Sequence, residues 1–536
     1  MKNIKKKIIY AGLAAFAVLI CAVSCTDRAD YYQTSKEVTG RSTLWELISQ
    51  QPELSTFAAL LKKVSYDHIL SGEQVYTVWA PENDALTGID PNDAAAALRV
   101  VTNHIARYAS PTSVAEAGDQ ILYMLNAKKL SFSRSGNSFF MGGEELVKKN
   151  LAASNGILHT LKKQIAFEPS IWQFMENAGY DSIRSYLYSF DKRQFYPNAS
   201  TPIDYNEEGL IVYDSVFFDQ NELWYVYSGA DGIGWLNNED SLYTMIVPDN
   251  KAWKEVYDRT FDYFKPDPTL KNPDSMQVAN TRYSIVQDLV FRGAINPWSY
   301  SETDTLHSTR WAPIINPARL FTGLTPVQVS NGWVYPTSRL NYELNESTVK
   351  PVKVEAEYAA GRWFNPLSDN GSLYYYHSDL PDVSNHYYLY LQPSYSGAQP
   401  SVAFELPDVL TAEYNIYCVC LSQAYTDNIK DSTQWRSNRL KFEIHQWDRI
   451  GKKEDNKSWQ TIATFTEPIT STKYVTNPDG ISKILITENF KFPFANFRED
   501  DNVFRLKVFS YRDRNDPTTK FMNDVRIDYI LLESSR

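Results

Sequence analysis

The sequence predicts a multidomain protein in which two α+β domains precede an all-β antiparallel sandwich. Two observations predict it. A strand that ends at a proline and leads into an acidic, amide-rich turn occurs at residues 76–86 and again at residues 243–253. After residue 350 the helical periodicity gives way to short segments in which apolar and polar residues alternate. The 536 residues are enough for three domains of ordinary size.

The first 25 residues have the pattern of a secretory signal that ends at a cysteine. Four lysines among the first seven residues precede an apolar run from residue 8 to residue 23. This run is too short to remain as a membrane span. We therefore expect residues 1–24 to be removed as a signal peptide.

The tetrapeptide Ala-Val-Ser-Cys at residues 22–25 resembles a bacterial lipobox. The resemblance implies that Cys25 carries acyl chains, with residues 25–40 as a lipidated cysteine and a linker. Asp27 and Asp30 resemble the acidic signal that sends some Gram-negative lipoproteins to the outer face of the outer membrane. The alternative is ordinary signal cleavage nearby, which leaves Cys25 as a free thiol. We predict a lipid-anchored, outer-membrane protein that faces the cell exterior.

Composition excludes nucleic acid as a partner. The net charge is −11, and loss of residues 1–24 removes four lysines and no acid, which brings it to −15. Phosphate contacts need clustered lysine and arginine, and the chain has no such run. The 36 tyrosines and 13 tryptophans are typical of β-rich extracellular proteins, in which flat rings form strands and binding surfaces.

Cys418 and Cys420 are the cysteines that remain after residue 25. They lie in residues 414–421, which have the pattern of a strand, so both side chains point to one face. A disulfide between them would be badly strained, and a metal site would need partners that the local sequence lacks. We predict two buried, apolar thiols.

Residues 41–167 are predicted to form the first α+β domain. Residues 43–48 and 54–64 place apolar side chains at helical intervals. Residues 74–80 alternate as a strand that ends before Pro81, and Asp90 with the following proline is typical of a helix start. The apolar face of that helix would consist of Leu98, Val101, Ile105 and Tyr108.

Two short segments of this domain resemble the signatures of fasciclin domains. Residues 76–86 resemble the first signature, a Thr-Val-Phe-Ala-Pro strand followed by Thr-Asn-Asp-Ala-Phe. Residues 153–159 resemble the second, Ser-Asn-Gly-Val-Ile-His, and Asn103-His104-Ile105 stands where the family has Tyr-His-Val-Val. The order and spacing of the signatures imply a fasciclin-like fold for residues 41–167.

Both signatures recur more loosely in residues 168–348. Residues 243–253 repeat the first and residues 329–335 repeat the second, which implies a second, expanded fasciclin-like domain. The additional sequence lies around residues 196–235 and 266–274. Residues 288–293 replace the family's central histidine, so adhesive roles ascribed to that region of animal fasciclins do not carry over.

Folding alone accounts for these signatures. Pro81 and Pro248 cannot donate a ladder hydrogen bond, so each ends its strand. Asn-Gly at 155–156 and at 331–332 predicts a hairpin turn with both residues at positive φ. The residues expected to cap helices or to bond back to turns are Asn83, Asp84, Asp249 and Asn250.

Residues 349–536 are predicted to form the antiparallel sandwich. Residues 352–357 open it and residues 525–532 close it. The strands expected between them are 402–406, 414–421, 440–445, 461–465, 483–487 and 504–509. The two ends, Glu-Ala-Glu and Asp-Tyr-Ile, resemble jelly-roll carbohydrate-binding modules of the galactose-binding-like type. The resemblance implies a structural calcium ion held by Glu355, Glu357 and Asp528, and no other cofactor.

No catalytic motif is visible in the sequence. It has no Gly-x-Ser-x-Gly, no His-Glu-x-x-His and no glycine-rich phosphate loop. The seven histidines have no metal-ligand spacing, and His104 and His159 are expected to be structural. A glycosidase carboxylate pair leaves no sequence signature, so hydrolysis stays open. We expect a protein that is not an enzyme and name no catalytic residue.

Aromatic side chains of the last domain are the candidates for ligand binding. Sugar rings stack on aromatic planes while polar neighbours hold the hydroxyls. The candidates are Trp363, Tyr374, Tyr375, Tyr376, Tyr387, Tyr388, Tyr395, Trp435, Trp447 and Trp459. The alternative is that these rings face a core. We predict that Trp363, Trp435 and Arg436, which lie in expected loops, bind the ligand.

Two functions follow from these expectations. The first is a surface lipoprotein that binds extracellular glycan as an accessory to a TonB-dependent nutrient importer and its substrate-binding lipoprotein. The second is a structural or adhesive lipoprotein that binds protein partners and has no sugar site. Such a protein would brace or cap an importer, whose cargo could be peptide.

Overall fold

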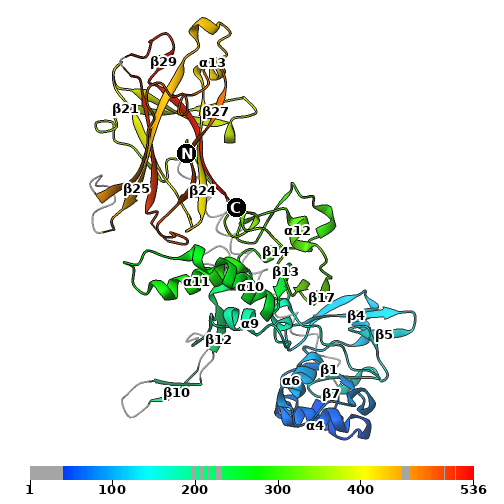
Figure 1. Cartoon of the computed structure of the whole chain (residues 1–536). Coiled ribbons are helices and arrows are strands. Elements are labelled where there is room, and N and C mark those ends of the chain that lie inside the picture. The colour runs from blue at the N-terminus through cyan, green and yellow to red at the C-terminus, as the bar shows by residue number, and fades with distance from the viewer. Residues whose placement is uncertain are drawn as a thin grey trace, which may run out of the picture. The chain divides into compact units, whose positions relative to one another are not determined.

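The computed structural model describes residues 40–195, 201–205, 211–214, 217–224, 232–449, 458–499, 501–513 and 515–535 (Figure 1). The predicted signal peptide, Cys25 and the linker up to residue 39 lie outside the described residues. The chain divides into two compact units. The first holds the residues up to Ser170 together with Asn237–Ser241 and Val329–Asn331, and the second holds the remainder. Within the described part of the chain, no helix is long and apolar enough to cross a membrane.

A four-stranded sheet organises the first α+β domain. Its strand order is β2-β1-β8-β7, with β1 (Tyr76–Pro81) and β8 (Gly156–Leu161) parallel at the centre. Strands β2 (Ile105–Arg107) and β7 (Leu151–Ala153) pair antiparallel at the edges. The helices are α3 (Leu44–Ser49), α4 (Ser55–Lys63), α5 (Tyr66–Ser71), α6 (Ala94–Asn103) and α7 (Thr112–Glu116). A second antiparallel sheet contains β3 (Gln120–Tyr123), β4 (Lys129–Ser135), β5 (Ser138–Met141) and β6 (Glu144–Glu145).

Helix α6 differs from the helix that the sequence predicted. Asp93, rather than Asp90, caps it, because the Asp93 carboxylate accepts hydrogen bonds from two backbone amides of the first turn at 2.9 and 3.1 Å. Ile105 lies in β2 instead of the helix. Leu98 is 44% exposed, so its assignment to the apolar face was wrong.

The same sheet recurs in the second α+β domain. Strands β13 (Tyr243–Pro248) and β18 (Gly332–Thr337) are parallel at its centre, and β14 (Val290–Arg292) and β17 (Val327–Val329) complete the order β14-β13-β18-β17. The helices are α8 (Ile171–Phe174), α9 (Asp181–Tyr188), α10 (Asn250–Thr260), α11 (Pro273–Val286) and α12 (Pro317–Phe321). Further strand pairs are β9 (Asp191–Phe195) with β12 (Phe217–Asn221), β10 (Thr201–Tyr205) with β11 (Ile211–Asp214), and β15 (Thr305–His307) with β16 (Pro313–Ile315). The predicted repetition of one α+β architecture is confirmed.

The Asn-Gly pairs place the glycine, but not the asparagine, at positive φ. The φ angles of Gly156 and Gly332 are 152° and 145°. A Cβ atom on these glycines would lie 1.9 Å from the carbonyl oxygen of Tyr76 and 1.8 Å from that of Tyr243. The glycines are therefore required because the neighbouring parallel strand runs against them. The expectation of positive φ at the preceding asparagines was wrong.

Asn155 instead stabilises the first domain through its side chain. Its Oδ1 accepts a hydrogen bond from the amide of Leu44 at 2.8 Å, and its Nδ2 donates to the carbonyls of Leu70 and Gly72 at 2.9 and 2.7 Å. Asn155 is 3% exposed. It therefore joins α3 and the end of α5 to the β7–β8 turn.

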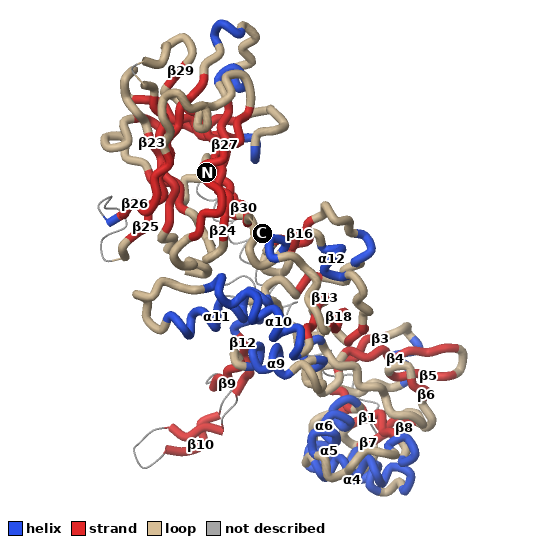
Figure 2. The backbone as a smooth tube through the Cα atoms, in the orientation of Figure 1, coloured by secondary structure: helices blue, strands red, loops and turns tan. Residues whose placement is uncertain are grey.

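Two sheets with a shared core form the C-terminal sandwich, as the strands in Figure 2 show. The first has the order β21-β22-β30-β24-β27, with β19 also on β30. Its strands are β19 (Val352–Glu355), β21 (Gly371–His377), β22 (Tyr387–Pro393), β24 (Glu413–Leu421), β27 (Ile481–Lys491) and β30 (Val525–Ser534). The second has the order β20-β23-β28-β25-β26, with β29 on β25. Its strands are β20 (Arg362–Trp363), β23 (Ser401–Glu405), β25 (Ser437–Trp447), β26 (Trp459–Phe465), β28 (Phe504–Tyr511) and β29 (Phe521–Met522).

All eight predicted strands of the sandwich are present, and the fold class is confirmed. Strands β20, β21, β22 and β29 were not expected from the sequence. Because Trp363 lies on β20, the expectation that it lies in a loop was wrong. Cys418 and Cys420 are buried, free thiols on β24, with their sulfur atoms 3.6 Å apart. The Cys420 thiol and burial raise the pKa of Cys418, so this thiol stays protonated. The prediction of two buried thiols is confirmed.

Candidate functional site

The structure separates the predicted ligand-binding residues. Trp363 of β20 pairs with Ala403 of β23, and Ala403 pairs with Lys507 of β28. Lys507 in turn pairs with Glu443 of β25, so Trp363 and Glu443 lie at the same level across the sheet. Trp435 and Arg436 precede Ser437, the first residue of β25. Ser437 and Glu443 are six positions apart on this strand, a span of about 20 Å. Trp363 and Trp435 therefore do not belong to one site.

Trp435 closes a turn near the helix α13 (Gln423–Thr426). It is half-buried, and its indole nitrogen donates to the carbonyl oxygen of Ile429 at 2.9 Å. Arg436 is exposed. Ligand binding by these two residues stays a prediction.

Trp363 lies beside a cavity of the sandwich and orients the side chain of Glu405, which lines that cavity. Its indole nitrogen donates to Oε1 of Glu405 at 2.6 Å, and Nδ2 of Asn502 donates to Oε2 of the same side chain at 3.0 Å. The Trp363 and Trp459 rings lie 6.5 Å apart. Glu405 is 7% exposed, so these two donors hold a nearly buried carboxylate in one orientation.

The cavity has a volume of about 270 Å³. It is lined by Lys353, Val354, Glu355, Tyr358, Ala360, Gly361, Glu405, Pro407 and Asn502. Tyr358 is 61% exposed, so one face of its ring is open to a ligand. Carboxylate and amide oxygens accept hydrogen bonds from hydroxyl groups, and a volume below that of a drug-sized pocket suits one small ring. We call this the Glu405 cavity.

Glu355 connects the Glu405 cavity to the other predicted calcium residues. Ser384 Oγ donates to Glu355 Oε1 at 2.8 Å, and the Ser384 amide donates to the two oxygens of Asp528 at 3.1 and 3.3 Å. Burial raises the pKa of Asp528 to about 7, against the hydrogen bond from Ser384, and the nearby Glu355 adds to the rise. Burial also raises the pKa of Glu357.

These acids fit a calcium ion in part. Glu355 Oε2 is buried and has no hydrogen-bond partner among the described residues. The other oxygen of Glu355 is paired with Lys353 Nζ at 2.8 Å. Across the described residues, no three His, Cys, Asp or Glu side chains are grouped as a metal ion needs. The side chains do not form a complete calcium site by themselves, and calcium binding stays a prediction.

Sequence reasoning missed Tyr358, Glu405 and Asn502. Tyr358 directly follows the Glu-Ala-Glu motif, and Glu405 ends a strand that was predicted. Their position near a predicted motif was a usable signal for these two. Asn502 is 97 residues from Glu405, and nothing in its local sequence indicates the contact.

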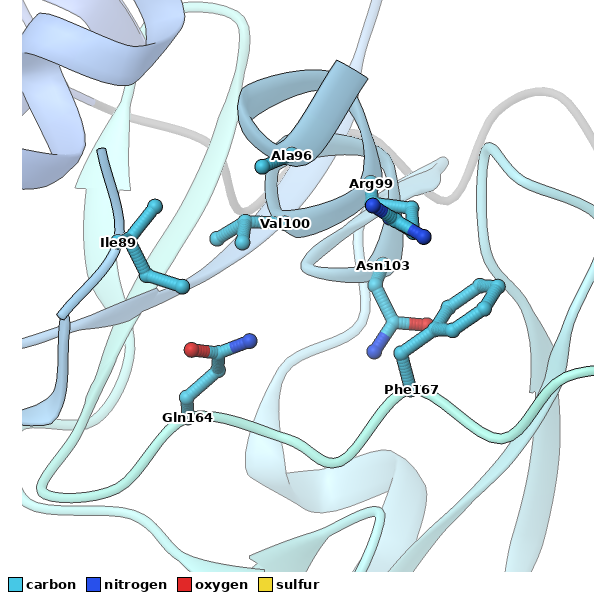
Figure 3. Close-up of a pocket in the computed structure, with 7 residues that line it drawn as sticks. All are labelled: Ile89, Ala96, Arg99, Val100, Asn103, Gln164 and Phe167. Carbon is cyan, nitrogen blue, oxygen red and sulfur yellow. The ribbon is translucent and has the colours of Figure 1, made fainter. Parts of the chain in front are cut away.

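A second cavity lies in the first α+β domain, beside α6 (Figure 3). Its volume is about 280 Å³, and it is lined by Ile89, Ala96, Arg99, Val100, Asn103, Gln164 and Phe167. The Asn103 amide already bonds the carbonyl of Ile165 at 3.3 Å and the side chain of Asn126 at 2.9 Å. Arg99 lies over the Phe167 ring at 6.0 Å. This cavity therefore offers an apolar wall with one cation and suits a hydroxyl-rich ligand poorly.

Comparison with known proteins identifies one part of the chain. No curated protein matches it in sequence. A FAS1 domain pair of the insect cell adhesion molecule fasciclin I resembles it at 13% identity and a TM-score of 0.21, over 55% of this chain and 99% of that chain. A Paenibacillus xanthan lyase resembles it at 13% identity and a TM-score of 0.20, over 40% of this chain and 17% of that chain. At such TM-scores neither likeness says what this chain binds.

The family of the first domain rests on its sequence. Residues 52–166 match the family model described as the fasciclin domain. The match falls inside the predicted range 41–167 and contains both signature segments. The chain therefore carries a fasciclin domain at residues 52–166 and ends in an antiparallel β-sandwich.

Proposed function

We propose that the protein is a non-catalytic surface lipoprotein that binds extracellular glycan through its C-terminal sandwich. The Glu405 cavity carries this proposal. Glu405, Glu355 and Asn502 bring two carboxylates and an amide to a volume of about 270 Å³, and the open ring of Tyr358 borders it. Side chains of this kind bind the hydroxyl groups and the apolar face of a sugar ring. A binding or adhesive role also agrees with the fasciclin domain.

Loss of the Tyr358 ring tests the cavity. Native affinity electrophoresis through gels that contain soluble neutral polysaccharides measures the binding of the mature chain from residue 26. Tyr358→Ala should weaken binding by about tenfold, and Tyr358→Phe should keep most of it, because stacking needs only the ring. Tyr395→Ala is the matched control, since Tyr395 is 65% exposed but does not line the cavity. Equal binding by wild type and Tyr358→Ala would remove the cavity from the proposal.

The lipid anchor at Cys25 forms the second part of the proposal. The lipobox-like tetrapeptide supports lipidation of Cys25, and Asp27 and Asp30 support an outer-membrane location that faces outward. At that surface the protein would serve a TonB-dependent importer and its substrate-binding lipoprotein. Two acyl chains give durable membrane binding, and an unacylated chain of this charge has none. A Cys25→Ala variant should be unprocessed or released from membranes. Its recovery with the outer membrane after a high-salt wash would contradict the anchor.

One observation favours the alternative, a protein-binding role in bracing an importer. Of the 13 tryptophans, Trp298 and Trp311 are the most exposed, at 74% and 76%. Thr309 anchors the β15–β16 loop through its amide to Val290 at 2.8 Å, and Trp311 has a φ of 59°. Trp298 lies outside this loop, in the short helix Pro297–Ser299. Exposed tryptophans on fixed backbone are typical of protein-binding hot spots. Crosslinking to an importer that is lost in Trp298→Ala and Trp311→Ala, without any glycan binding by wild type, would establish this role instead.

A further inference from the structure

Four tyrosines form a continuous cluster of aromatic rings on two neighbouring strands of the sandwich. Tyr374 and Tyr376 of β21 pair with Tyr390 and Tyr388 of β22. The ring centres of Tyr376 lie 5.9 Å from Tyr388 and 5.8 Å from Tyr390, and Tyr374 lies 6.3 Å from Tyr390. We call these four residues the tyrosine platform.

The tyrosine platform lies on the side of the sheet that faces away from the core. Leu389 and Leu391 of β22 are fully buried in the core between the sheets. Because successive side chains of a strand point to opposite faces, Tyr388 and Tyr390 point outward. Tyr374 and Tyr376 are 45% and 47% exposed on β21, which ends the strand order of its sheet. Tyr388 is 8% exposed and packs with Val383 and Leu421, and Tyr390 is half-buried. The rings of Tyr374 and Tyr376 are therefore the ones open to a ligand, and the rings of Tyr388 and Tyr390 support them.

One arginine and two aspartates lie beside the tyrosine platform. The Arg526 guanidinium lies 4.9 Å from the centre of the Tyr390 ring. The Tyr390 hydroxyl donates to Asp524 Oδ2 at 3.2 Å, and Arg526 Nη1 donates to the same oxygen at 3.4 Å. Arg526 Nη2 lies 3.6 Å from Asp427. The two carboxylates compensate the cation, so the site presents donors and acceptors without a net positive charge.

One hydrogen-bond donor of the Arg526 side chain is unused. The side chain is 7% exposed, and its Nε has no hydrogen-bond partner among the described residues. A buried donor without a partner costs free energy, which a ligand oxygen would recover. An anionic ligand is disfavoured, because Asp524 and Asp427 lie beside Arg526 and the mature chain carries a charge of −15.

We propose that the tyrosine platform is a second carbohydrate-binding surface, one that binds an extended stretch of a neutral polysaccharide. It rests on the proposed function, yet it is separate from the Glu405 cavity, whose volume suits one ring. Side chains two residues apart on a strand lie about 7 Å apart, so consecutive tyrosines meet successive sugar rings. Proline-rich peptides also bind tyrosine-lined surfaces. A donor and an acceptor fixed together beside the rings favour hydroxyl groups, which need both.

Alanine variants of β21 test the platform with a control on the same strand. The mature chain from residue 26 is titrated with soluble β-glucan, galactomannan, arabinoxylan and levan, with polygalacturonate as the anionic comparison and a proline-rich peptide as the peptide comparison. Tyr374→Ala and Tyr376→Ala should each weaken binding of one neutral polysaccharide by about tenfold. Tyr375→Ala is the matched control, because Tyr375 is 66% exposed but points to the other face of β21. Thermal melting of each variant verifies that the fold is intact.

The outcomes separate the platform from the cavity. Loss of binding in Tyr374→Ala and Tyr376→Ala, with Tyr375→Ala like wild type and little effect of 0.5 M salt, supports the platform. If Tyr358→Ala abolishes binding while the platform variants bind as wild type, the platform is overturned and the proposed function stands. An equal loss in Tyr375→Ala overturns the platform as well. Binding of the proline-rich peptide alone, with loss in Tyr376→Ala, would show that the ligand is a peptide and overturn the carbohydrate assignment.

Discussion

Asn83 and Asn250 have the same role in the two α+β domains, because each caps an earlier helix that lacks a side-chain cap of its own. Asn83 Oδ1 accepts a hydrogen bond from the amide of Thr56 in α4 at 2.9 Å. Asn250 Oδ1 accepts one from the amide of Ser182 in α9 at 2.8 Å. Each asparagine stands two residues after the proline that ends the central strand. The signature thus joins a strand end to a helix start that is distant in sequence.

Removal of either cap should destabilise its domain. Loss of a capping side chain costs about 1 kcal/mol, so Asn83→Ala and Asn250→Ala should each lower the free energy of unfolding by that amount in urea denaturation. Asp84→Ala is the matched control, since Asp84 is exposed and its neighbour caps the helix. Equal stability of Asn83→Ala and Asp84→Ala would contradict the capping role.

The signature glycines should tolerate no side chain. In Gly156→Ala and Gly332→Ala the new Cβ would overlap a carbonyl oxygen of the neighbouring strand, at 1.9 and 1.8 Å. We expect losses of about 3 kcal/mol or more in unfolding free energy, because backbone must move. Gly88→Ala is the control: its φ is 94° and its surroundings are open, so strain alone should cost about 1–2 kcal/mol. Similar losses in all three variants would mean that φ, and not the close approach, decides.

Acid should destabilise the first α+β domain more than the second. Burial lowers the pKa of His104 and of His159 to about 4. His104 is held neutral between the carbonyl of Val100 at 2.7 Å and the amide of Ile165 at 3.0 Å. In the unfolded chain these histidines have a pKa near 6.5, so below that pH the unfolded chain binds more protons than the folded chain. The free energy of unfolding therefore decreases as the pH falls from about 6.5 to 4, by up to about 3 kcal/mol for each histidine.

In the second α+β domain, the strand registers place Leu289 at the position of His104 and Tyr335 at the position of His159. These side chains do not take up protons in this range. Hydrogen exchange of the mature chain at pH 7 and pH 5 should show faster opening in residues 41–167 and less change in residues 168–348. A variant with His104→Gln and His159→Gln should lose this pH dependence. An unchanged pH profile in that variant would disprove the assignment to histidine.

Calcium should stabilise the sandwich at pH 8. Glu355, Glu357 and Asp528 repel one another when ionised, and burial raises the pKa of Asp528 to about 7, so at pH 8 the protein holds unfavourable charge there. A divalent cation would relieve it and use the unpaired Glu355 Oε2. We expect 5 mM calcium chloride to raise the melting temperature of wild type by several degrees relative to EGTA, and to have less effect on Asp528→Asn. No difference between calcium and EGTA in wild type would mean that the sandwich holds no such ion.

Local sequence predicted those parts of the fold that depend on neighbouring residues. Pro81 and Pro248 end their strands because a proline cannot donate to the ladder, wherever the strand lies. Alternation located all eight expected strands of the sandwich, because a strand with one buried face repeats every two residues. It failed at β21, where Tyr374, Tyr375 and Tyr376 follow one another without alternation. A tyrosine suits an exposed face and a half-buried face equally, so the pattern carries no signal.

The binding surfaces depend on pairing between distant segments. Glu405 receives its hydrogen bonds from Trp363 and Asn502, which are 42 and 97 residues away. Tyr390 meets Asp524 across 134 residues. The sequence by itself determined the repeated α+β architecture, the sandwich and the region rich in aromatic residues. Only the tertiary structure decided which rings stay open and which polar groups stand beside them, because strand order and register are set by packing of the whole sheet and not by any one segment.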